Sequence, residues 1–418
     1  GSGKTTTLMT FVDYALENNQ ACILIDGKGD PELTERVETL AEKYGRVFYE
    51  FNTDGTGMRY NPLSEGTPSE LTDKMMTLSD WSEEHYKLSS QEFLQYLFRV
   101  FKEKNISANL TTVSKYCNKE SLIALITENQ KKQAIHTLTE AEIPKEEKKE
   151  PGILFFNSDS EEIEEASEEV AASVGVEEPE KDKLREIIGK IERIDDKAIK
   201  GLASRLSILA EGDLRDLFKE DGTNTLELNS VIEEKAIVVF SLDSLRYPDV
   251  ARQLGKLIIN DIKTNVSRHS RTRKGERVTL IFDEFNVFVS EQVVDVINKS
   301  RSAGFEALLS FQSLADIDAV SVPLRRQIIQ NSNTLIVQRQ NEATDAEELA
   351  KTLGTKDGYA HTFQTGEDGM TGQGSVRGIK EFWFHPDEIK ELGQGMAIVK
   401  RQSSKGTIRK KVKIRKVD

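Results

Sequence analysis

Short apolar runs alternate with amphipathic segments over the first 60 residues of the chain. The segment Thr5–Asn18 is predicted to be a helix, and the apolar run Ala21–Ile25 (ACILI) is predicted to be a strand that ends at Asp26. A second helix is expected from about Pro31 to Tyr44, and a strand over Val47–Phe51 follows it. Strands that alternate with helices in this way predict a parallel sheet.

The pattern becomes helical after Asn61-Pro62-Leu63. From about Ser69 to Phe218, apolar residues recur with helical spacing and few runs resemble strands, as in the amphipathic segment Glu92–Lys102. We therefore expect an all-alpha domain inserted into an α/β domain. Within it, Asn157–Glu180 contains ten Asp or Glu residues and no Lys or Arg. This composition favours a solvated or disordered linker and leaves open a docking site for a basic partner.

The α/β pattern resumes towards the C-terminal end. Five apolar runs are predicted to be strands there: Ala236–Leu242, Val278–Phe282, Glu306–Phe311, Thr334–Val337 and Met396–Val399. Nearly continuous apolar runs indicate strands buried on both faces, as in a doubly wound sheet. The predicted fold class is α/β with a mainly parallel sheet. The expected divisions are 1–66 and 219–418 for the two parts of the α/β domain, and 67–218 for the insertion.

Composition limits the classes of function. The chain has 418 residues, 37% of them hydrophobic and 31% charged, which suits a globular protein of more than one domain. Its net charge of −14 excludes a surface that attracts nucleic acid everywhere, so any such site must be local. No apolar run reaches the length of a membrane span, and no signal peptide is visible. Cys22 and Cys117 lie far apart without metal-ligand spacing, which favours reduced thiols in a cytoplasmic protein.

The first six residues match the end of the motif G-x-x-x-x-G-K-[ST]. Glycines in this motif let backbone N–H groups surround the phosphates of a nucleotide, and the following helix adds the positive end of its dipole. Lys4 is expected to neutralise the β- and γ-phosphates of ATP, and the Thr5 hydroxyl to bind Mg²⁺. The predicted nucleotide-binding residues are Gly1, Ser2, Gly3, Lys4, Thr5 and Thr6. The chain begins inside this motif, without its first glycine, and we interpret it as a fragment. A chance occurrence of the sequence Gly1–Thr5 is the alternative.

A strand that ends in two acids provides the second part of such a site. The run Val278–Glu284 (VTLIFDE) is apolar up to its last two residues. Asp283 is expected to hold Mg²⁺, partly through a bound water, and Glu284 to act as the general base that polarises the attacking water. Acids often end strands at the solvent, so this pattern alone is weak evidence. Together with the lysine loop at the start of the chain it indicates a nucleotide site.

Four further residues are candidates on weaker grounds. Asp26 and Lys28 follow the strand after the first helix, where the carboxyl ends of parallel strands line a ligand crevice. They can face the nucleotide or a neighbouring subunit, or form a plain glycine turn. Gln312 ends a strand and can detect the γ-phosphate, and Arg301 on a subunit edge can stabilise transition-state charge. Ordinary surface or core roles stay open for both.

Two basic clusters are candidate contacts for nucleic-acid phosphates. The first lies within Lys263–Arg277 and the second is Arg409–Lys416. The alternatives are a solvated loop for the first cluster and an amphipathic edge strand for the second. Neither contains the interleaved aromatic residues of a stacking platform, and the spacing of His and Cys predicts no metal site beyond Mg²⁺ bound with a nucleotide.

Together these motifs resemble one family. In order they are the P-loop, Asp26-Gly27-Lys28-Gly29, Asn61-Pro62-Leu63 before the helical insertion, Asp283-Glu284, Arg301, Phe311–Ala315, and the segment from Gly374–Arg377 through His385–Ile389 to Leu392. The chain resembles the type IV coupling proteins of bacterial conjugation, the TraG/TraD branch of the FtsK–HerA translocases. The insertion matches in position only, and its acidic stretch departs from the family.

The resemblance implies a RecA-like P-loop ATPase that uses ATP and Mg²⁺. It implies a homo-hexameric ring in the full-length form, although a monomeric fragment would agree with it. A membrane anchor preceding this chain would hold the ring at the cytoplasmic face of the bacterial cell membrane. The implied partners are DNA, with a single strand favoured, relaxase or other relaxosome proteins, and a type IV secretion channel. By position, Arg301 would act in trans and Gln312 would be the motif III glutamine.

Three functions follow from these expectations. The first is an ATP-driven DNA translocase that delivers a relaxase-bound strand to the secretion channel. The second is a related secretion-system ATPase that powers channel assembly or protein export without pumping DNA. The third is a catalytically silent adaptor, which the presence of Lys4 and Glu284 disfavours.

Overall fold

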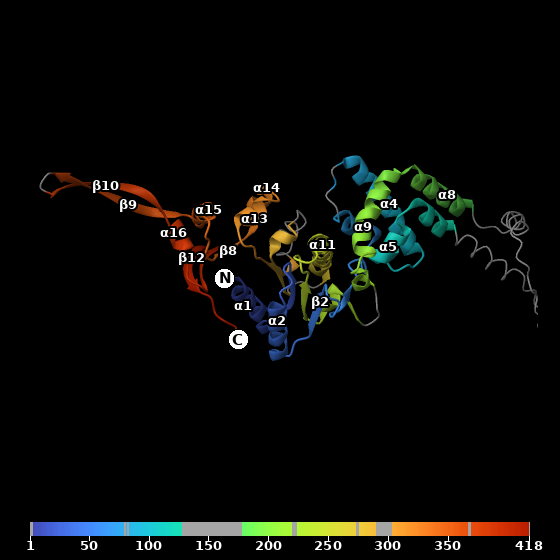
Figure 1. Ribbon diagram of the computed structural model, residues 1–418, viewed down its shortest axis with the longest axis horizontal. Helices are drawn as coiled ribbons and strands as arrows, with labels where there is room; N and C mark the ends of the chain where they lie inside the picture. The colour runs from blue at the N-terminus through green and yellow to red at the C-terminus, as the bar shows by residue number, and fades with distance from the viewer. Residues whose placement is uncertain are drawn as a thin grey trace, which may run out of the picture. The chain divides into compact units, whose positions relative to one another are not determined.

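The computed structural model describes residues 3–78, 81, 83–127, 178–219, 224–272, 276–289, 303–366 and 369–417. The chain divides into two compact units (Figure 1). The first comprises Gly1–Tyr60 and Asp221–Asp418, and the second comprises Asn61–Glu220. Most of the acidic stretch, up to residue 177, lies outside the described residues.

A five-stranded parallel sheet forms the core of the first unit. Its strands in spatial order are β2 (Phe48–Asn52), β5 (Ile237–Ser241), β1 (Ala21–Asp26), β6 (Val278–Asp283) and β7 (Phe305–Leu309). Every residue of β1, β5 and β6 is buried. This burial explains why these strands are apolar along their whole length instead of alternating with polar residues.

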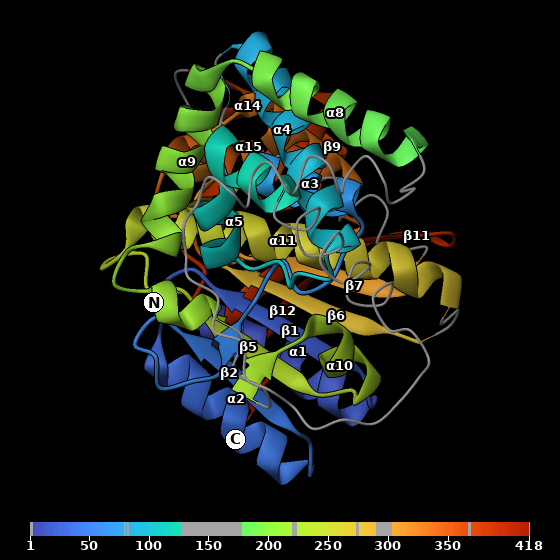
Figure 2. The same ribbon diagram turned by 90° about the vertical axis from the view of Figure 1, so that its right-hand side faces the viewer.

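Helices cover both faces of this sheet, as Figure 2 shows. On one face, α1 (Lys4–Glu17) and α2 (Pro31–Lys43) pack against Cys22 and Leu24 of β1. On the other lies α11 (Pro248–Thr272), whose Asp261 accepts a hydrogen bond from the buried hydroxyl of Tyr60 at 2.7 Å. The predicted α/β fold with a mainly parallel sheet is therefore confirmed.

Short elements complete this part of the unit. Strands β3 (Arg59–Tyr60) and β4 (Thr225–Leu226) pair in parallel. The short helices are α10 (Leu228–Glu233), η3 (Phe285–Val287), α13 (Leu314–Asp318) and α14 (Val322–Asn331).

Two of the predicted strands do not join the parallel sheet. Strand β8 (Thr334–Val337) pairs antiparallel with β11 (Met396–Ser403), which pairs antiparallel with β12 (Gly406–Lys413). Helices α15 (Ala343–Leu353) and α16 (Pro386–Lys390) pack on this small sheet. The expectation of one doubly wound sheet was wrong for these two runs, because an apolar run reports burial and not the partner strand.

A long antiparallel hairpin was not predicted at all. It consists of β9 (Thr355–Gly366) and β10 (Gly369–Phe382), which pair with each other in a two-stranded sheet. Tyr359 and Val376 are exposed on it. The hairpin is rich in glycine and polar residues, so its sequence lacks the apolar alternation by which strands are predicted.

The two basic clusters lie in different kinds of structure. Lys263–Thr272 forms the last turns of α11, so the expectation of a solvated loop was wrong for this part. Its His269 is buried and packs edge-on against the ring of Phe305, with centroids 5.2 Å apart. In the second cluster, Arg409–Lys413 belongs to the edge strand β12, as one alternative predicted.

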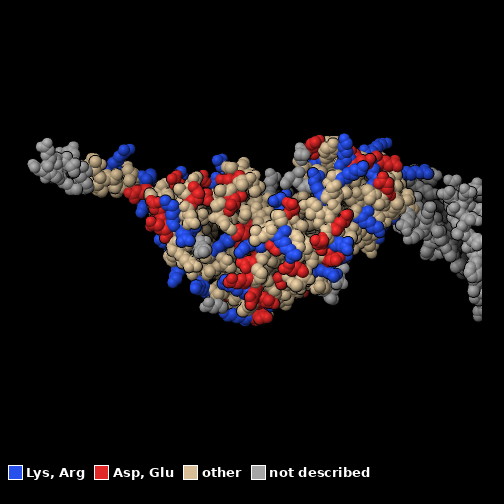
Figure 3. Space-filling model, in the orientation of Figure 1, with Lys and Arg blue, Asp and Glu red and all other residues tan. Residues whose placement is uncertain are grey.

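The second unit is helical in its described residues. Its helices include α3 (Pro68–Met76), α4 (Glu84–Glu103), α5 (Leu110–Tyr116), α8 (Glu178–Arg193), α9 (Asp196–Ala210) and η1 (Arg215–Phe218). Residues 119–127 are helical as well. The amphipathic α4 buries Phe93, Leu97 and Phe101, as its spacing predicted. No helix among the described residues is long and apolar enough to cross a membrane. Figure 3 shows basic and acidic side chains interspersed over the described part of the visible face.

Both cysteines are free and buried, one in each unit. Burial raises the pKa of the Cys22 thiol to about 12, and burial does the same for Cys117. Neither thiol is therefore a reactive thiolate near neutral pH.

Candidate functional site

Lys4 is the first residue of α1. Gly3 caps this helix with φ of 100°, a left-handed conformation that glycine adopts without strain. Gly3 has no side chain that could accept from the first N–H groups of the helix, and no acid lies in the first turn. The positive end of the helix dipole is thus left for an anionic ligand. Thr5 and Thr6 follow in α1, whereas Gly1 and Ser2 lie outside the described residues.

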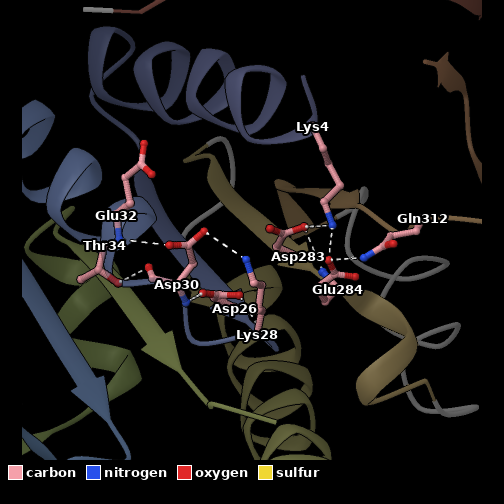
Figure 4. Close-up of polar contacts among 9 residues, drawn as sticks. All are labelled: Lys4, Asp26, Lys28, Asp30, Glu32, Thr34, Asp283, Glu284 and Gln312. Atoms are coloured by element: carbon pink, nitrogen blue, oxygen red, sulfur yellow. Dashed lines mark hydrogen bonds and ion pairs between the residues drawn. The ribbon is translucent and has the colours of Figure 1, made fainter. Parts of the chain in front are cut away.

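The Lys4 ammonium lies against the two acids at the end of β6, as Figure 4 shows. Its Nζ is 2.6 Å from Glu284 Oε1 and 3.1 Å from Asp283 Oδ1. Burial alone would lower the pKa of Lys4, but the charges and hydrogen bonds of Asp283 and Glu284 outweigh burial, so the pKa is raised. Lys4 is therefore fully charged at neutral pH.

Gln312 reaches the same carboxylate from beyond the end of β7. Its Nε2 donates a hydrogen bond of 2.9 Å to Glu284 Oε1 (Figure 4). One oxygen of Glu284 thus accepts from both Lys4 and Gln312. Three residues that are far apart in sequence meet because the carboxyl ends of β6 and β7 and the start of α1 lie at one edge of the sheet.

The backbone of Glu284 is strained. Its φ is 48° and its ψ is 50°, a left-handed conformation that costs a residue with a Cβ about 1–2 kcal/mol. Its N–H donates to Asp283 Oδ1 at 2.9 Å. Strained residues of this kind persist where the surrounding structure fixes them, and they gather at functional sites.

Asp26 organises a neighbouring loop at the same edge. It is fully buried beside Asp283, its register partner on β6, and accepts hydrogen bonds from the N–H groups of Lys28 (2.9 Å) and Asp30 (2.5 Å). Burial raises the pKa of Asp26, the hydrogen bonds of Asp30 and Lys28 lower it, and the Asp283 charge raises it further; the balance is a raised pKa. The Lys28 side chain is 57% exposed and lies 3.6 Å from Asp30. Asp26 thus shapes the loop, and Lys28 stays accessible.

The structure brings together Lys4, Asp283, Glu284 and Gln312, and it places Asp26 beside Asp283. Arg301 lies outside the described residues, so its predicted role has no structural test here.

A contact to the P-loop helix from the C-terminal sheet was missed in the sequence. Gln338, directly after β8, donates a hydrogen bond of 2.8 Å to the hydroxyl of Thr7. Gly395, before β11, lies against Gly3. The rule that singled out Asp26, a polar residue directly after a buried strand, also applies to Gln338 and could have found it.

A family comparison identifies the chain. Residues 277–394 match the family described as the TraM recognition site of TraD and TraG. The chain belongs to the TraG/TraD family of type IV coupling proteins. Over 142 residues this coupling protein is also 32% identical to an uncharacterized protein of Mycoplasma pneumoniae, a match that covers 34% of this chain and 90% of that protein.

Solved structures share the fold of this coupling protein. The conjugative coupling protein TrwB, lacking 70 N-terminal residues, matches 100% of this chain and 83% of its own with a TM-score of 0.59 and 14% identity. TrwB in complex with the ATP analogue ADPNP matches 96% of this chain and 86% of its own, with a TM-score of 0.52 and 12% identity. VirB4 of Thermoanaerobacter pseudethanolicus matches 100% of this chain and 87% of its own, with a TM-score of 0.54 and 16% identity. The predicted RecA-like fold is confirmed.

Proposed function

We propose that this coupling protein is an ATP-driven DNA translocase that delivers a relaxase-bound strand to a type IV secretion channel during conjugation. The observation that carries the proposal is the meeting of Lys4, Asp283, Glu284 and Gln312 at the carboxyl end of the parallel sheet. This arrangement combines a phosphate-binding cation, a metal-binding acid, a base and a polar group beside the base. TrwB, which shares the fold, has been solved with an ATP analogue.

Each residue has a defined task in the proposed reaction. The N–H groups at the start of α1 and the Lys4 ammonium bind the phosphates and neutralise the charge that develops on them. Glu284 accepts the proton of the attacking water, and Gln312, hydrogen-bonded to the same carboxylate, orients the base. Asp26 and Lys28 shape the nucleotide side of the loop.

The residues around Lys4 also fit Mg²⁺. Thr5 offers a hydroxyl and Asp283 a carboxylate, and hard oxygen donors of this kind suit Mg²⁺. Asp283 would hold the ion, or a water bound to it, through its carboxylate, and the Glu284 N–H donates to one oxygen of this carboxylate. When bound, Mg²⁺ supplies charge stabilisation at the phosphates. No group of three or more His, Cys, Asp or Glu side chains in the described part of the chain could hold another metal ion.

The proposed machine is a homo-hexamer at the cytoplasmic face of the bacterial cell membrane. In it, Arg301 of one subunit stabilises transition-state charge at the site of its neighbour. Residues 1–66 and 219–418 form the nucleotide-binding domain, and 67–218 form the inserted all-alpha domain. Relaxosome proteins are the proposed partners, since residues 277–394 match a family described as a TraM recognition site.

A second function is favoured by the likeness to VirB4. In this alternative, the same ATPase site powers assembly of the secretion channel or protein export without pumping DNA. The residues of the site do not separate the two functions, because both need ATP hydrolysis.

The test is ATP hydrolysis by the full-length protein with and without single-stranded DNA, beside a Glu284→Gln control. We expect turnover that the DNA raises and that Glu284→Gln reduces by at least about 10²-fold, the lower value for a general base. Glu284-dependent turnover that neither single- nor double-stranded DNA changes would favour the secretion ATPase. Absence of any Glu284-dependent turnover would refute the assignment of the base.

A further inference from the structure

The turn that follows Glu284 is held from several sides. The N–H of Phe285 donates to the carbonyl of Ser310 at 2.9 Å, and the N–H of Val287 donates to the carbonyl of Glu284 at 3.0 Å. The N–H of Gly27 donates to the carbonyl of Asp283 at 3.1 Å. These bonds fix the backbone on both sides of the strained Glu284, which is the condition under which such strain persists.

Three aromatic rings pack beneath the turn. Phe282, Phe285 and Phe288 are fully buried, and their ring centroids lie between 5.9 and 6.2 Å apart in tilted or edge-to-face arrangements. Such pairs add stability beyond the area that they bury. The rings therefore form a rigid packed support under the residues that carry Asp283 and Glu284.

Gly255 of α11 lies close to one of these rings, Phe288. A methyl group at this position would stand 2.7 Å from Phe288 Cβ and 3.0 Å from its Cγ. Phe288 Cβ is bound directly to the backbone, so the side chain cannot swing away and either the helix or the turn must shift. Glycine within a helix is about 0.5–1 kcal/mol less stable than alanine. The 25-residue α11 carries this cost where it packs against Phe288.

Gly27 approaches the same turn from the end of β1. A methyl group there would stand 3.0 Å from Val287 Cγ2 and 3.1 Å from the carbonyl oxygen of Glu284. These distances are tighter than ordinary van der Waals contact but less severe than those at Gly255. Two glycines from separate elements thus lie against the turn that follows Glu284, Gly255 at Phe288 and Gly27 at Val287 and the Glu284 carbonyl.

We infer that Gly27 and Gly255 are positioning residues for Glu284. They allow β1 and α11 to press on the turn so closely that the Glu284 carboxylate has one position, between Lys4 and Gln312. The inference rests on the proposed function, because it assigns the glycines a part in the hydrolysis that Glu284 performs. Neither glycine touches the reacting atoms, and each acts through Glu284.

The experiment compares Gly255→Ala with the matched helix variant Gly189→Ala. A methyl group at Gly189 of α8 meets nothing within 4 Å. We expect Gly255→Ala to lower kcat for ATP by about 10- to 100-fold, since a displacement of about 1 Å in a reacting geometry can cost about 10²-fold. The Kd for a fluorescent ATP analogue should stay within about twofold of the wild type. Gly189→Ala should leave both values unchanged.

A double-mutant cycle separates positioning from general damage. Because Gly255 acts through Glu284, Gly255→Ala should cause no further loss of turnover in a Glu284→Gln background. A kcat for Gly255→Ala equal to that of Gly189→Ala, or an equal loss in both backgrounds, would overturn the inference. Wild-type turnover that does not depend on Glu284 would instead overturn the proposed function.

Gly27→Ala keeps the test decisive if Gly255→Ala does not fold, as judged by circular dichroism. Its contacts are milder, so we expect a smaller loss of kcat, about three- to tenfold by the same geometric argument, at unchanged Kd. A kcat equal to that of the wild type in folded Gly27→Ala would contradict the inference for this residue.

Discussion

The ammonium of Lys4 lies 2.6 Å from Oε1 of Glu284, across 280 positions of sequence. The contact joins the first turn of α1 to the end of β6, and Gln312 donates to the same oxygen. One carboxylate oxygen is therefore shared by the residue proposed to bind phosphate and the residue proposed to orient the base. Each of these groups can be removed separately, and each removal should affect a different step.

Lys4→Ala should weaken ATP binding by at least about tenfold, because a charge-assisted hydrogen bond is worth about 1.5–3 kcal/mol. The phosphates would lose their cation, and Asp283 and Glu284 would repel them. Titration with a fluorescent ATP analogue measures the Kd. Lys351→Ala, on the exposed face of α15, is the control and should leave the Kd unchanged. An unaltered Kd in Lys4→Ala would show that Lys4 does not bind phosphate.

Gln312→Ala should lower kcat by about tenfold or more, with little change in the Kd for ATP. The variant removes the hydrogen bond of 2.9 Å to Glu284 but leaves Lys4 in place. Steady-state hydrolysis measures kcat, and Gln402→Ala on the exposed part of β11 serves as the control. A selective rise of KM at constant kcat would mean that Gln312 contributes to binding and not to the chemical step.

Arg301→Ala should lose about 10³–10⁵ in turnover while keeping ATP binding, if the arginine acts on a neighbouring subunit. The sharper test mixes this variant with Lys4→Ala. In a mixed ring, an intact site of an Arg301→Ala subunit can receive Arg301 from a Lys4→Ala neighbour, so activity should return. Two inactive variants that stay inactive when mixed would contradict the action in trans.

Asp26→Asn should change how stability depends on pH. The folded protein raises the pKa of Asp26 above its usual 3.8, so folded Asp26 holds its proton to a higher pH than the unfolded chain does. The free energy of unfolding therefore falls as pH rises from 3.8 through the folded pKa, and the variant lacks this contribution.

Urea unfolding of the wild type and of Asp26→Asn measures the free energy of unfolding of each protein. The measurements run between pH 4 and pH 7, about the range of carboxyl titration. The asparagine is expected to be less stable overall, since its amide can accept with one atom only and Asp26 accepts from Lys28 and Asp30. The difference in unfolding free energy between the wild type and Asp26→Asn should become smaller as pH rises. A difference in unfolding free energy that stays constant or grows with pH would contradict the raised pKa of Asp26.

Sequence patterns predicted the parts of the fold that local periodicity determines. The expected helix Thr5–Asn18 is α1 at Lys4–Glu17, and the run Val278–Phe282 is β6. They also assigned Lys4 and Glu284 to one nucleotide site, and the structure places the two side chains 2.6 Å apart. The strand-end rule drew attention to Gln312 for the same reason.

Partner strands and close approaches could not be read in this way. Nothing in the run Thr334–Val337 distinguishes a strand of the parallel sheet from β8, which pairs antiparallel with β11. Likewise, Gly255 is one glycine in a helical pattern, and its contact with Phe288 appears only when α11 is packed. Arg301 lies outside the described residues, and its role stays a prediction.

The place of β1 in the sheet has a consequence for biosynthesis. Its neighbours on both sides, β5 and β6, begin at Ile237 and Val278, more than 200 residues later in the chain. At about 5–20 residues per second, the ribosome needs roughly 10–40 s to produce β5 after β1. During this time the strand ACILID has no partner, while the helices of Asn61–Glu220 emerge and can pack among themselves. The nascent chain therefore carries an apolar strand with two unpaired edges until β5 and β6 are made, and chaperones can bind to such a strand.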